Sequence, residues 1–319
     1  MRRATLILVS VAFLAAAALA FAVPGFTVFR LIQATIWSIA VLGMVMLCGV
    51  SGQFSFAHAA FYGLGAYTAA ILANHTGLSG YLSLPVAAGV CYVAGRAFGR
   101  VTASQGIWNQ ALISYALVIA FPQLLRWRPI EKLTGGTQGL YLDPPEAPDW
   151  IGLSTDRWWY LICLALLAGG LALARNLIDS RSGRALRAVR DNELAAYAQG
   201  IDVARYRATA YGISAAYAGL AGCLAALMYT YVGPTSYGFG LSLQLLIGLV
   251  VGGMGSLGGA VIGGVFLQFF PDIAAIIGKR MSAILYAGTL IAVIVAMPNG
   301  VAGLIQSVWT RLRTRRPSR

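Results

Sequence analysis

The side chains best suited to recognition chemistry gather in one polar interval, from Arg175 to Arg207. The interval carries seven arginines and four acidic residues, which are 11 of the 33 charged residues in the chain. Guanidinium and carboxylate groups recognise partners through charge and directed hydrogen bonds. Long apolar segments flank the interval on both sides. The interval is therefore expected to present a binding surface.

The spacing within this interval predicts two short helices joined by a capped turn. Arginines recur at every third position with an apolar side opposite them, which indicates an amphipathic helix over residues 181–190. Asp191 is expected to cap the second helix, with Glu193 in its first turn and Gly200 at its end. The alternative is an amphipathic loop lying on anionic lipid. The acidic residues and the defined stop favour a rigid projection.

A second polar group lies between two apolar segments, in the uncharged stretch 48–58. Gly49 and Gly52 permit a break in the helix, and the stretch contains Gln53, Ser55 and His58. Irregular backbone at membrane depth is tolerated where it is buried in protein or lines a cavity. One interpretation is the polar lining of a translocation path at a broken helix. The other is interhelical hydrogen bonding that holds a bundle together.

Catalytic motifs are missing from the sequence. It contains no HExxH zinc helix, no GxSxG elbow and no Walker A phosphate loop. The four cysteines fall singly in apolar segments, with the spacing of neither a metal site nor a disulfide framework. The sequence therefore predicts a protein that is not an enzyme, with no metal, no cofactor and no nucleotide-binding site of its own.

The composition indicates a protein dissolved in lipid. Of 319 residues, 59% are apolar and 10% are charged, and the mean hydropathy is +0.74. Polar breaks divide the chain into about ten apolar segments near the length that spans a bilayer as a helix. They lie at 4–23, 29–50, 56–74, 81–98, 106–125, 157–175, 207–228, 241–257, 259–277 and 282–298. We expect an all-α, polytopic transmembrane bundle forming a single permease domain over residues 1–319.

The distribution of basic residues predicts the topology. Threading the ten segments places 16 of the 23 basic residues on one side, which is then cytoplasmic and holds both termini. Residues 126–157 form an external loop, 176–206 a cytoplasmic loop and 301–319 a basic cytoplasmic tail. The net charge of +13 is thus explained by topology and does not indicate nucleic-acid binding.

Two regions leave alternatives open. Residues 1–22 resemble either a cleaved secretory signal or a first span. Residues 241–277 either span twice or form a re-entrant hairpin around a glycine-rich turn. For either alternative at 241–277, pairs of glycines four residues apart predict close helix packing: Gly248 with Gly252, Gly255 with Gly259, and Gly259 with Gly263.

The energy source follows from where the acids lie. Nine of the ten acidic residues fall in loops, and Asp272 is close to a segment end. Ion-coupled carriers and proton pumps generally carry ionisable residues within their spans. The rival is a stand-alone ion-coupled or facilitative carrier of a small polar solute such as an amide or urea, and a membrane enzyme is third. The distribution favours energy supplied by a partner.

Three stretches resemble the branched-chain amino-acid ABC permeases, specifically the LivM-type subunit. They are Gly-Gln-Phe-Ser-Phe-Ala-His-Ala-Ala-Phe at 52–61, Leu-Thr-Gly-Gly-Thr-Gln-Gly-Leu at 133–140, and Gly-Arg-Ala-Leu-Arg-Ala-Val-Arg-Asp-Asn-Glu-Leu-Ala-Ala at 183–196. The similarity covers most of residues 30–300. Ala57, the run at 106–110 and Tyr197 depart from the family pattern, and the change at 106–110 bears on the substrate.

The resemblance implies a multi-pass permease subunit of an ABC importer for branched-chain or related small amino acids, in the bacterial inner membrane. Its implied partners are a second permease, cytoplasmic ATP-binding subunits that use the ATP, an extracytoplasmic substrate-binding protein, and membrane lipid. Gln53, Ser55 and His58 would lie near the path. The residues that would couple to the ATPase are Gly183, Arg184, Arg187, Arg190, Asp191, Asn192, Glu193, Ala195, Ala196 and Gly200.

Overall fold

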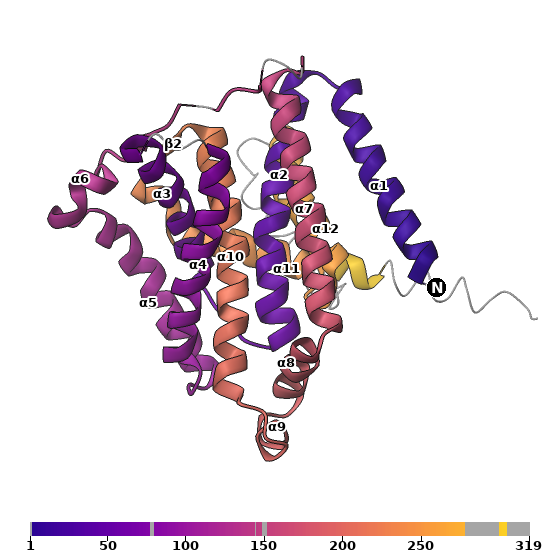
Figure 1. The fold of residues 1–319 in the computed structure, drawn as a ribbon, viewed down its shortest axis with the longest axis vertical. Coiled ribbons are helices and arrows are strands. Elements are labelled where there is room, and N and C mark those ends of the chain that lie inside the picture. The colour runs from indigo at the N-terminus through magenta and orange to yellow at the C-terminus, as the bar shows by residue number, and fades with distance from the viewer. Residues whose placement is uncertain (1, 77–79, 144, 149–151, 278–299, 305–319) are drawn as a thin grey trace, which may run out of the picture.

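The protein is a bundle of helices with two short helices projecting from one end (Figure 1). The computed structural model describes residues 2–76, 80–143, 145–148, 152–277 and 300–304. The predicted segment 282–298 and most of the tail 301–319 lie outside the described residues. The long helices are α1 (Arg2–Ala22), α2 (Gly25–Met44), α3 (His58–Thr76), α4 (Gly80–Thr102), α5 (Ile107–Leu125), α7 (Thr155–Asp179), α10 (Val203–Tyr229), α11 (Phe239–Gly252) and α12 (Leu257–Ile277).

Helices α2 and α10 form the centre of the bundle. Helix α10 packs against α4, α3 and α2, and α2 packs against α7, α12 and α11. In their most apolar stretches, 78% of the residues of α2 and of α10 are buried, against 22% for α5. Figure 1 shows α5 at the margin of the bundle, on the far side of α4 from α2. The core therefore lies around two helices, while α5 exposes most of its surface.

Small residues bring the backbones of the central helices together. A Cβ at Gly222 of α10 would collide with the carbonyl oxygen of Tyr62, and one at Gly65 of α3 would collide with the carbonyl of Gly219. Between helices in lipid the hydrophobic effect contributes little, so association depends on close van der Waals contact. Alanine, glycine and serine therefore line most of the buried face of α10.

The expectation of a helical membrane protein is confirmed. Among the described residues, five helices are long and apolar enough to cross a membrane: 25–50, 80–102, 107–125, 155–179 and 203–229. They match predicted segments two, four, five, six and seven. The full set of ten segments and the cytoplasmic position of both termini stay predictions.

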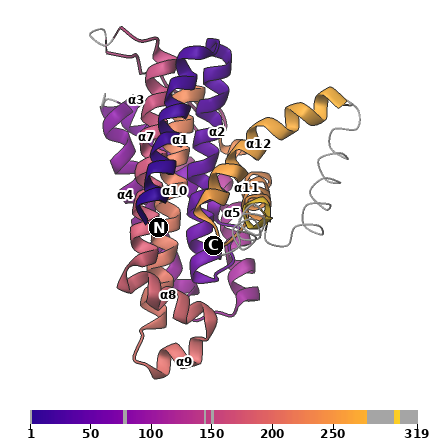
Figure 2. The same cartoon turned by 90° about the vertical axis from the view of Figure 1, so that its right-hand side faces the viewer.

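The predicted eighth segment is shorter in the structure than in the sequence analysis. Helix α11 has 14 residues, about 21 Å at the α-helical rise, which is less than the ~30 Å of a hydrocarbon core. It turns at Gly253, whose φ of +109° excludes most other residues. Helix α12 then runs obliquely to α2 (Figure 2). Helix α11 alone is therefore short for a span, while α12, with 21 residues, is long enough for one, so both alternatives for 241–277 stay predictions.

The glycines of this hairpin are not equivalent. A Cβ at Gly252 would collide with the carbonyl of Gly259, and one at Gly263 with the carbonyl of Gly248. A Cβ at Gly255 would meet no atom within 4 Å, because Gly255 lies in the turn between the helices. Packing therefore requires small residues at 252, 259 and 263, and the expectation for Gly255 is wrong.

Short elements complete the chain. The loop 126–157 carries a 3-10 helix (Arg128–Ile130), α6 (Glu131–Thr134) and β1 (Leu140–Tyr141). Strand β1 pairs antiparallel with β2 (Tyr231–Val232), a two-residue addition to an otherwise helical fold. A second 3-10 helix (Pro234–Tyr237) precedes α11, and α8 (Arg181–Asp191) and α9 (Glu193–Ala198) form the projection. The β pair ties the loop before α7 to the segment after α10.

Replacing Gly222 with Val is expected to destabilise the bundle, because the added side chain has no room beside the backbone of Tyr62. Overpacking typically costs about 1–3 kcal/mol. Thermal unfolding in detergent measures the effect. The matched control is Gly89→Val on α4, where a Cβ would meet nothing within 4 Å. Equal melting temperatures for the two variants would contradict the packing argument.

Candidate functional site

Helix α8 is fixed to the end of α7 by its own arginines. Arg187 donates to the carbonyl of Ile178 at 2.9 Å, and Arg184 donates to that of Asp179 at 3.1 Å. The last carbonyls of a helix lack intrahelical partners and attract cations. Ser180 caps α8 by accepting from the amide of Gly183 at 3.2 Å. A Cβ at Gly183 would collide with the carbonyls at the end of α7.

The last arginine of α8 reaches the interrupted second span. Residues Val45–Val50 continue α2 as a π-helix. Arg190 donates to the carbonyl of Gly49 at 2.8 Å and pairs with Asp191 at 2.9 Å. Gly52 has a φ of +69°, and a Cβ there would collide with the Arg190 side chain. Arg190 thus connects the projection to the point where the span breaks.

Helix α9 begins and ends with well-formed caps. The N-cap is Asn192, which accepts from the amide of Ala195 at 3.0 Å, so the expectation that Asp191 would cap this helix is wrong. Asp191 is instead the last residue of α8. At the other end the amide of Gly200 donates to Tyr197 and that of Ile201 to Ala196, with φ +77° at Gly200. This is the Schellman arrangement, which stops a helix sharply.

A bidentate ion pair joins α9 to α10. Arg207 donates to the two carboxylate oxygens of Glu193 at 3.0 and 2.7 Å. The same guanidinium donates to the carbonyl of Ala103, after α4, at 2.8 Å. The Arg207 side chain is 14% exposed and that of Glu193 49%. Bidentate geometry fixes orientation as well as distance, so α9, α10 and the end of α4 are held together.

The interrupted span satisfies its backbone with buried polar side chains. Ser51, Gln53, Ser55 and His58 are all at most 3% exposed. The Gln53 side chain donates to Ser51 Oγ at 3.0 Å and to the carbonyl of Arg207 at 3.3 Å. Ser55 Oγ accepts from the amide of Ala57 at 3.0 Å. Through Gln53, this stretch is therefore hydrogen-bonded to Arg207, which forms the ion pair with Glu193.

His58 has a defined tautomer. Ser214 Oγ lies 2.8 Å from His58 Nε2 and donates its one proton to the carbonyl of Gly43 at 2.8 Å. Nε2 must then carry a hydrogen and donate to Ser214. In the described part of the chain, His58 Nδ1 and Gln53 Oε1 have no hydrogen-bond partner. Each is a buried acceptor with capacity for one further donor.

Serines from two other helices bond to the backbone of residues 56–59. The amide of Phe56 donates to Ser114 Oγ of α5 at 3.0 Å, and that of Ala59 donates to Ser242 Oγ of α11 at 3.1 Å. Ser242 Oγ also donates to the carbonyl of Phe56. Phe56 packs edge-on against Tyr115 and Phe239. Helices α5 and α11 thus meet the interrupted span directly.

Comparison with known proteins identifies the family of this chain. A family model described as the permease component of the branched-chain amino acid transport system matches residues 26–294. The chain belongs to this permease family. It is 28% identical to the LivM permease protein of Salmonella typhimurium over 288 residues, which are 82% of this chain and 66% of the relative.

Other relatives are similar in extent. LivH of Escherichia coli is 26% identical over 290 residues, covering 84% of this chain and 91% of LivH. BraD of Pseudomonas aeruginosa is 25% identical over 286 residues, with 84% and 91% covered. The chain thus spans 66% of the length of the LivM relatives but most of LivH and BraD. No solved structure matches this permease.

Some of the predicted coupling residues bond within the chain or are buried, and others are exposed. Most of them bond within the chain and fix the projection, as Arg184, Arg187 and Glu193 do. Ala196 is buried against Val189 and Val203. Ala195 and Gly200 are exposed. Coupling of all these residues to an ATPase stays a prediction. So does the position of Gln53, Ser55 and His58 on a translocation path.

The sequence analysis missed the two most exposed large side chains of α9. Leu194 is 82% exposed and Tyr197 74% exposed. Residues three apart lie on the same face of a helix, so the two form an outward apolar pair. The pattern was visible, since Leu194 and Tyr197 are the large apolar residues of a helix otherwise made of alanines and one glutamate. Ser114, Ser214 and Ser242 were also missed, because single serines in apolar runs give no local signal.

Glu193→Lys is expected to detach α9, because two cations would face each other where the bidentate pair now lies. Hydrogen bonds between charged groups contribute about 1.5–3 kcal/mol. ATP-driven uptake into vesicles should fall while the protein remains inserted. The double variant Glu193→Lys/Arg207→Glu should recover part of the loss by restoring opposite charges. Uptake no better in the double variant than in Glu193→Lys would contradict an internal role for Glu193.

Proposed function

We propose that this chain is the membrane-spanning permease subunit of an ABC importer for branched-chain or related small amino acids, driven by ATP-binding partner subunits. The observation that carries this proposal is the projection α8–α9, which bonds to Gly49 through Arg190 and to α10 through the Glu193–Arg207 pair, and which exposes an apolar pair outward. Family membership agrees with this function, since the relatives are named as branched-chain amino acid transport permeases.

Leu194 and Tyr197 are the proposed contact with the ATP-binding subunit. Both side chains are exposed on one face of α9, while Asn192 and Gly200 fix the ends of that helix. Interfaces are most often anchored by a few large apolar or aromatic side chains. In this proposal the arginines of α8 hold the helix pair in position and do not themselves face the partner.

The hydrogen bonds that hold the projection α8–α9 connect it to the stretch that follows the second span. Arg190 connects α8 to Gly49, and Arg207 connects α9 to Gln53 through its backbone carbonyl. A displacement of the projection α8–α9 would therefore act on both ends of the stretch 49–53. Charge-assisted bonds and a bidentate pair transmit displacement better than a flexible loop would. We propose that ATP-dependent motion reaches the interrupted span by these two connections.

A stand-alone ion-coupled carrier fits the burial pattern less well. Among the described residues, no aspartate, glutamate, lysine or arginine is fully buried. The buried polar groups are hydroxyls, amides and the single imidazole of His58. Ion and proton coupling in membranes generally uses buried ionisable groups. The observation favours energy from partner subunits over an ion gradient.

The proposed setting is the bacterial inner membrane, with α8 and α9 on the cytoplasmic side. A second permease and an extracytoplasmic substrate-binding protein complete the proposed assembly. The excess of basic residues on the α8–α9 side supports this orientation. The loop 126–157, with β1 and α6, lies at the opposite end of the bundle (Figure 1). That loop is the proposed side for the binding protein.

The class of transporter is tested by reconstitution. The purified chain alone in proteoliposomes is expected to take up no leucine, because its described residues include no fully buried aspartate, glutamate, lysine or arginine for ion coupling. Uptake should appear when the partner subunits that co-purify in mild detergent are added with ATP. Uptake by the chain alone, with or without an ion gradient, would favour the rival carrier. Partners that contain no ATP-binding subunit would also contradict the proposal.

The docking pair is tested by Leu194→Glu/Tyr197→Glu. Charges on this face are expected to abolish co-purification of the ATP-binding subunit without lowering the melting temperature, because both side chains are exposed. The matched control is Leu133→Glu/Tyr141→Glu at the opposite end, where the exposed fractions are 47% and 74%. Retained co-purification in the α9 variant, or an equal loss in the control, would overturn the assignment.

A further inference from the structure

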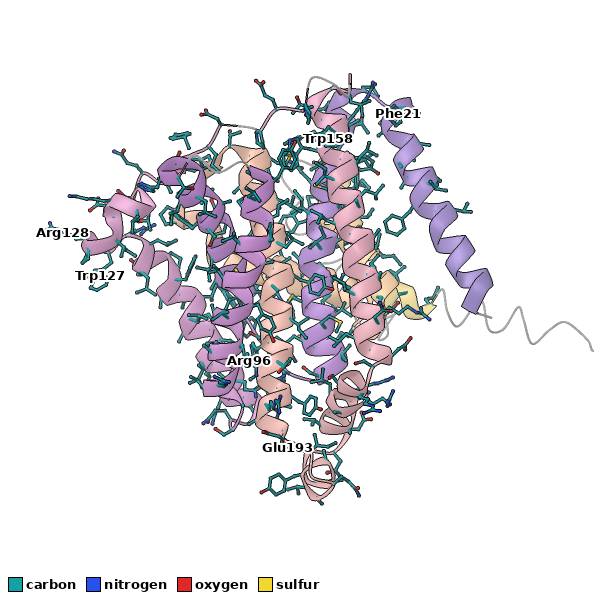
Figure 3. The ribbon with its side chains drawn as sticks, in the orientation of Figure 1. Phe21, Arg96, Trp127, Arg128, Trp158 and Glu193 are labelled. Atoms are coloured by element: carbon teal, nitrogen blue, oxygen red, sulfur yellow. The ribbon has the colours of Figure 1, made fainter. Side chains whose placement is uncertain are left out.

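A basic cavity lies beside the projection, at the end of the bundle that carries α8 and α9. Its volume is about 450 Å³, and its lining includes Arg96 and Arg100 from the end of α4 and Arg205 from the start of α10. Asp202 and Ala204 complete the lining. Figure 3 shows Arg96 at the same end as Glu193. The two helices that form the cavity pack closely along the rest of their length.

The lining of this cavity carries three arginines and one aspartate, so within the described part of the chain its charge is positive overall. None of Arg96, Arg100 and Arg205 forms a salt bridge there. Arg96 donates to the hydroxyl of Tyr92 at 3.1 Å, and this neutral partner leaves the charge of Arg96 unbalanced. Asp202 is engaged as the N-cap of α10, where it accepts from the amide of Arg205 at 3.0 Å. Arg190 and Arg207, by contrast, are both paired with acids.

An apolar face of α4 leads directly to the cavity. Val86 is 41% exposed and Val93 67% exposed. Val86, Val93 and Arg100 follow one another at intervals of seven residues, close to two helical turns. All three therefore lie on one face of α4. Further exposed apolar residues flank this face, namely Leu82, Val90 and Val101. The face begins near the opposite end of the helix and ends at the arginines.

We propose that this cavity binds the phosphodiester headgroup of an anionic phospholipid, whose acyl chains lie along the outward face of α4. Guanidinium groups bind phosphate oxygens through charge and paired hydrogen bonds. Basic cavities between membrane helices on the cytoplasmic side are suited to anionic headgroups. The apolar face distinguishes a lipid from a free anion, which would need only the arginines.

The site would connect lipid to the projection. Asp202, Ala204 and Arg205 follow α9 directly in the chain, and Arg205 lies two residues before Arg207, which holds Glu193. A headgroup bridging Arg100 and Arg205 would tie α4 to the first turn of α10 from outside the bundle. This inference does not rest on the proposed transport function, because it concerns only this chain and its lipid.

Native mass spectrometry of the delipidated full-length protein in detergent tests the proposal. Phosphatidylglycerol is expected to bind more tightly than phosphatidylcholine with the same acyl chains. Each arginine near a membrane surface contributes about fivefold, so Arg100→Gln/Arg205→Gln should weaken phosphatidylglycerol binding about 30-fold. Phosphatidylcholine binding should not change. Arg100→Lys/Arg205→Lys keeps the charge and should retain most of the affinity.

The control is Arg128→Gln/Arg175→Gln, which removes the same charge from two exposed sites on other elements. An equal loss in the control, or equal binding of the two lipids by the wild-type protein, would overturn the proposal. Displacement of phosphatidylglycerol by inorganic phosphate at the same concentration would indicate a free-anion site instead. Unchanged lipid binding with loss of the ATP-binding subunit would make the cavity a protein contact, and would also contradict the proposal.

Discussion

Buried backbone amides and carbonyls need hydrogen-bond partners, and the chain leaves regular helix between the end of its second span at Val50 and the start of α3 at His58. Residues between the π-helix and α3 cannot satisfy one another by regular helix bonds. Serines from α5 and α11 bind the backbone of 56–59, and Arg190 binds the carbonyl of Gly49. Helices α5, α8 and α11 each bring a polar side chain to this stretch of backbone.

The arginines of α8, and Arg207 of α10, also bind carbonyls of other elements. Arg184 and Arg187 satisfy carbonyls at the end of α7, and Arg190 and Arg207 reach across to other helices. A guanidinium has five donors, so it can bind an acid and a carbonyl at once. Charge concentrated at one end of the bundle thus fixes a helix pair in space. The apolar surface of that pair, Leu194 and Tyr197, is left for a partner.

Much of this could be predicted from the sequence. Five of the predicted spans, the amphipathic helix α8 and the stop of α9 at Gly200 follow from local spacing and caps, and these appear in the structure. The cap assignment was wrong by one residue, because Asp191 and Asn192 are both good N-caps and only the backbone geometry chooses between them. Gly255 was misjudged because spacing alone does not tell a packed glycine from one in a turn. The predicted segment ran past the end of α11, since the glycine-rich turn at 253–256 carries no charge that would mark the end of the helix.

The sequence by itself determined that this is a helical membrane protein with one charged projection and a polar break, because composition and periodicity are local properties. Only the tertiary structure decided what the charges do. Arg190 and its acceptor are 141 residues apart, and Arg207 and the carbonyl of Ala103 are 104 apart. No local pattern specifies such pairs, since they depend on which carbonyl the packing of α2, α4 and α10 brings within reach. For the same reason, only the structure showed that Arg184, Arg187 and Arg190 bond within the chain, while Leu194 and Tyr197 are exposed. Which of these residues couple to a partner stays a prediction.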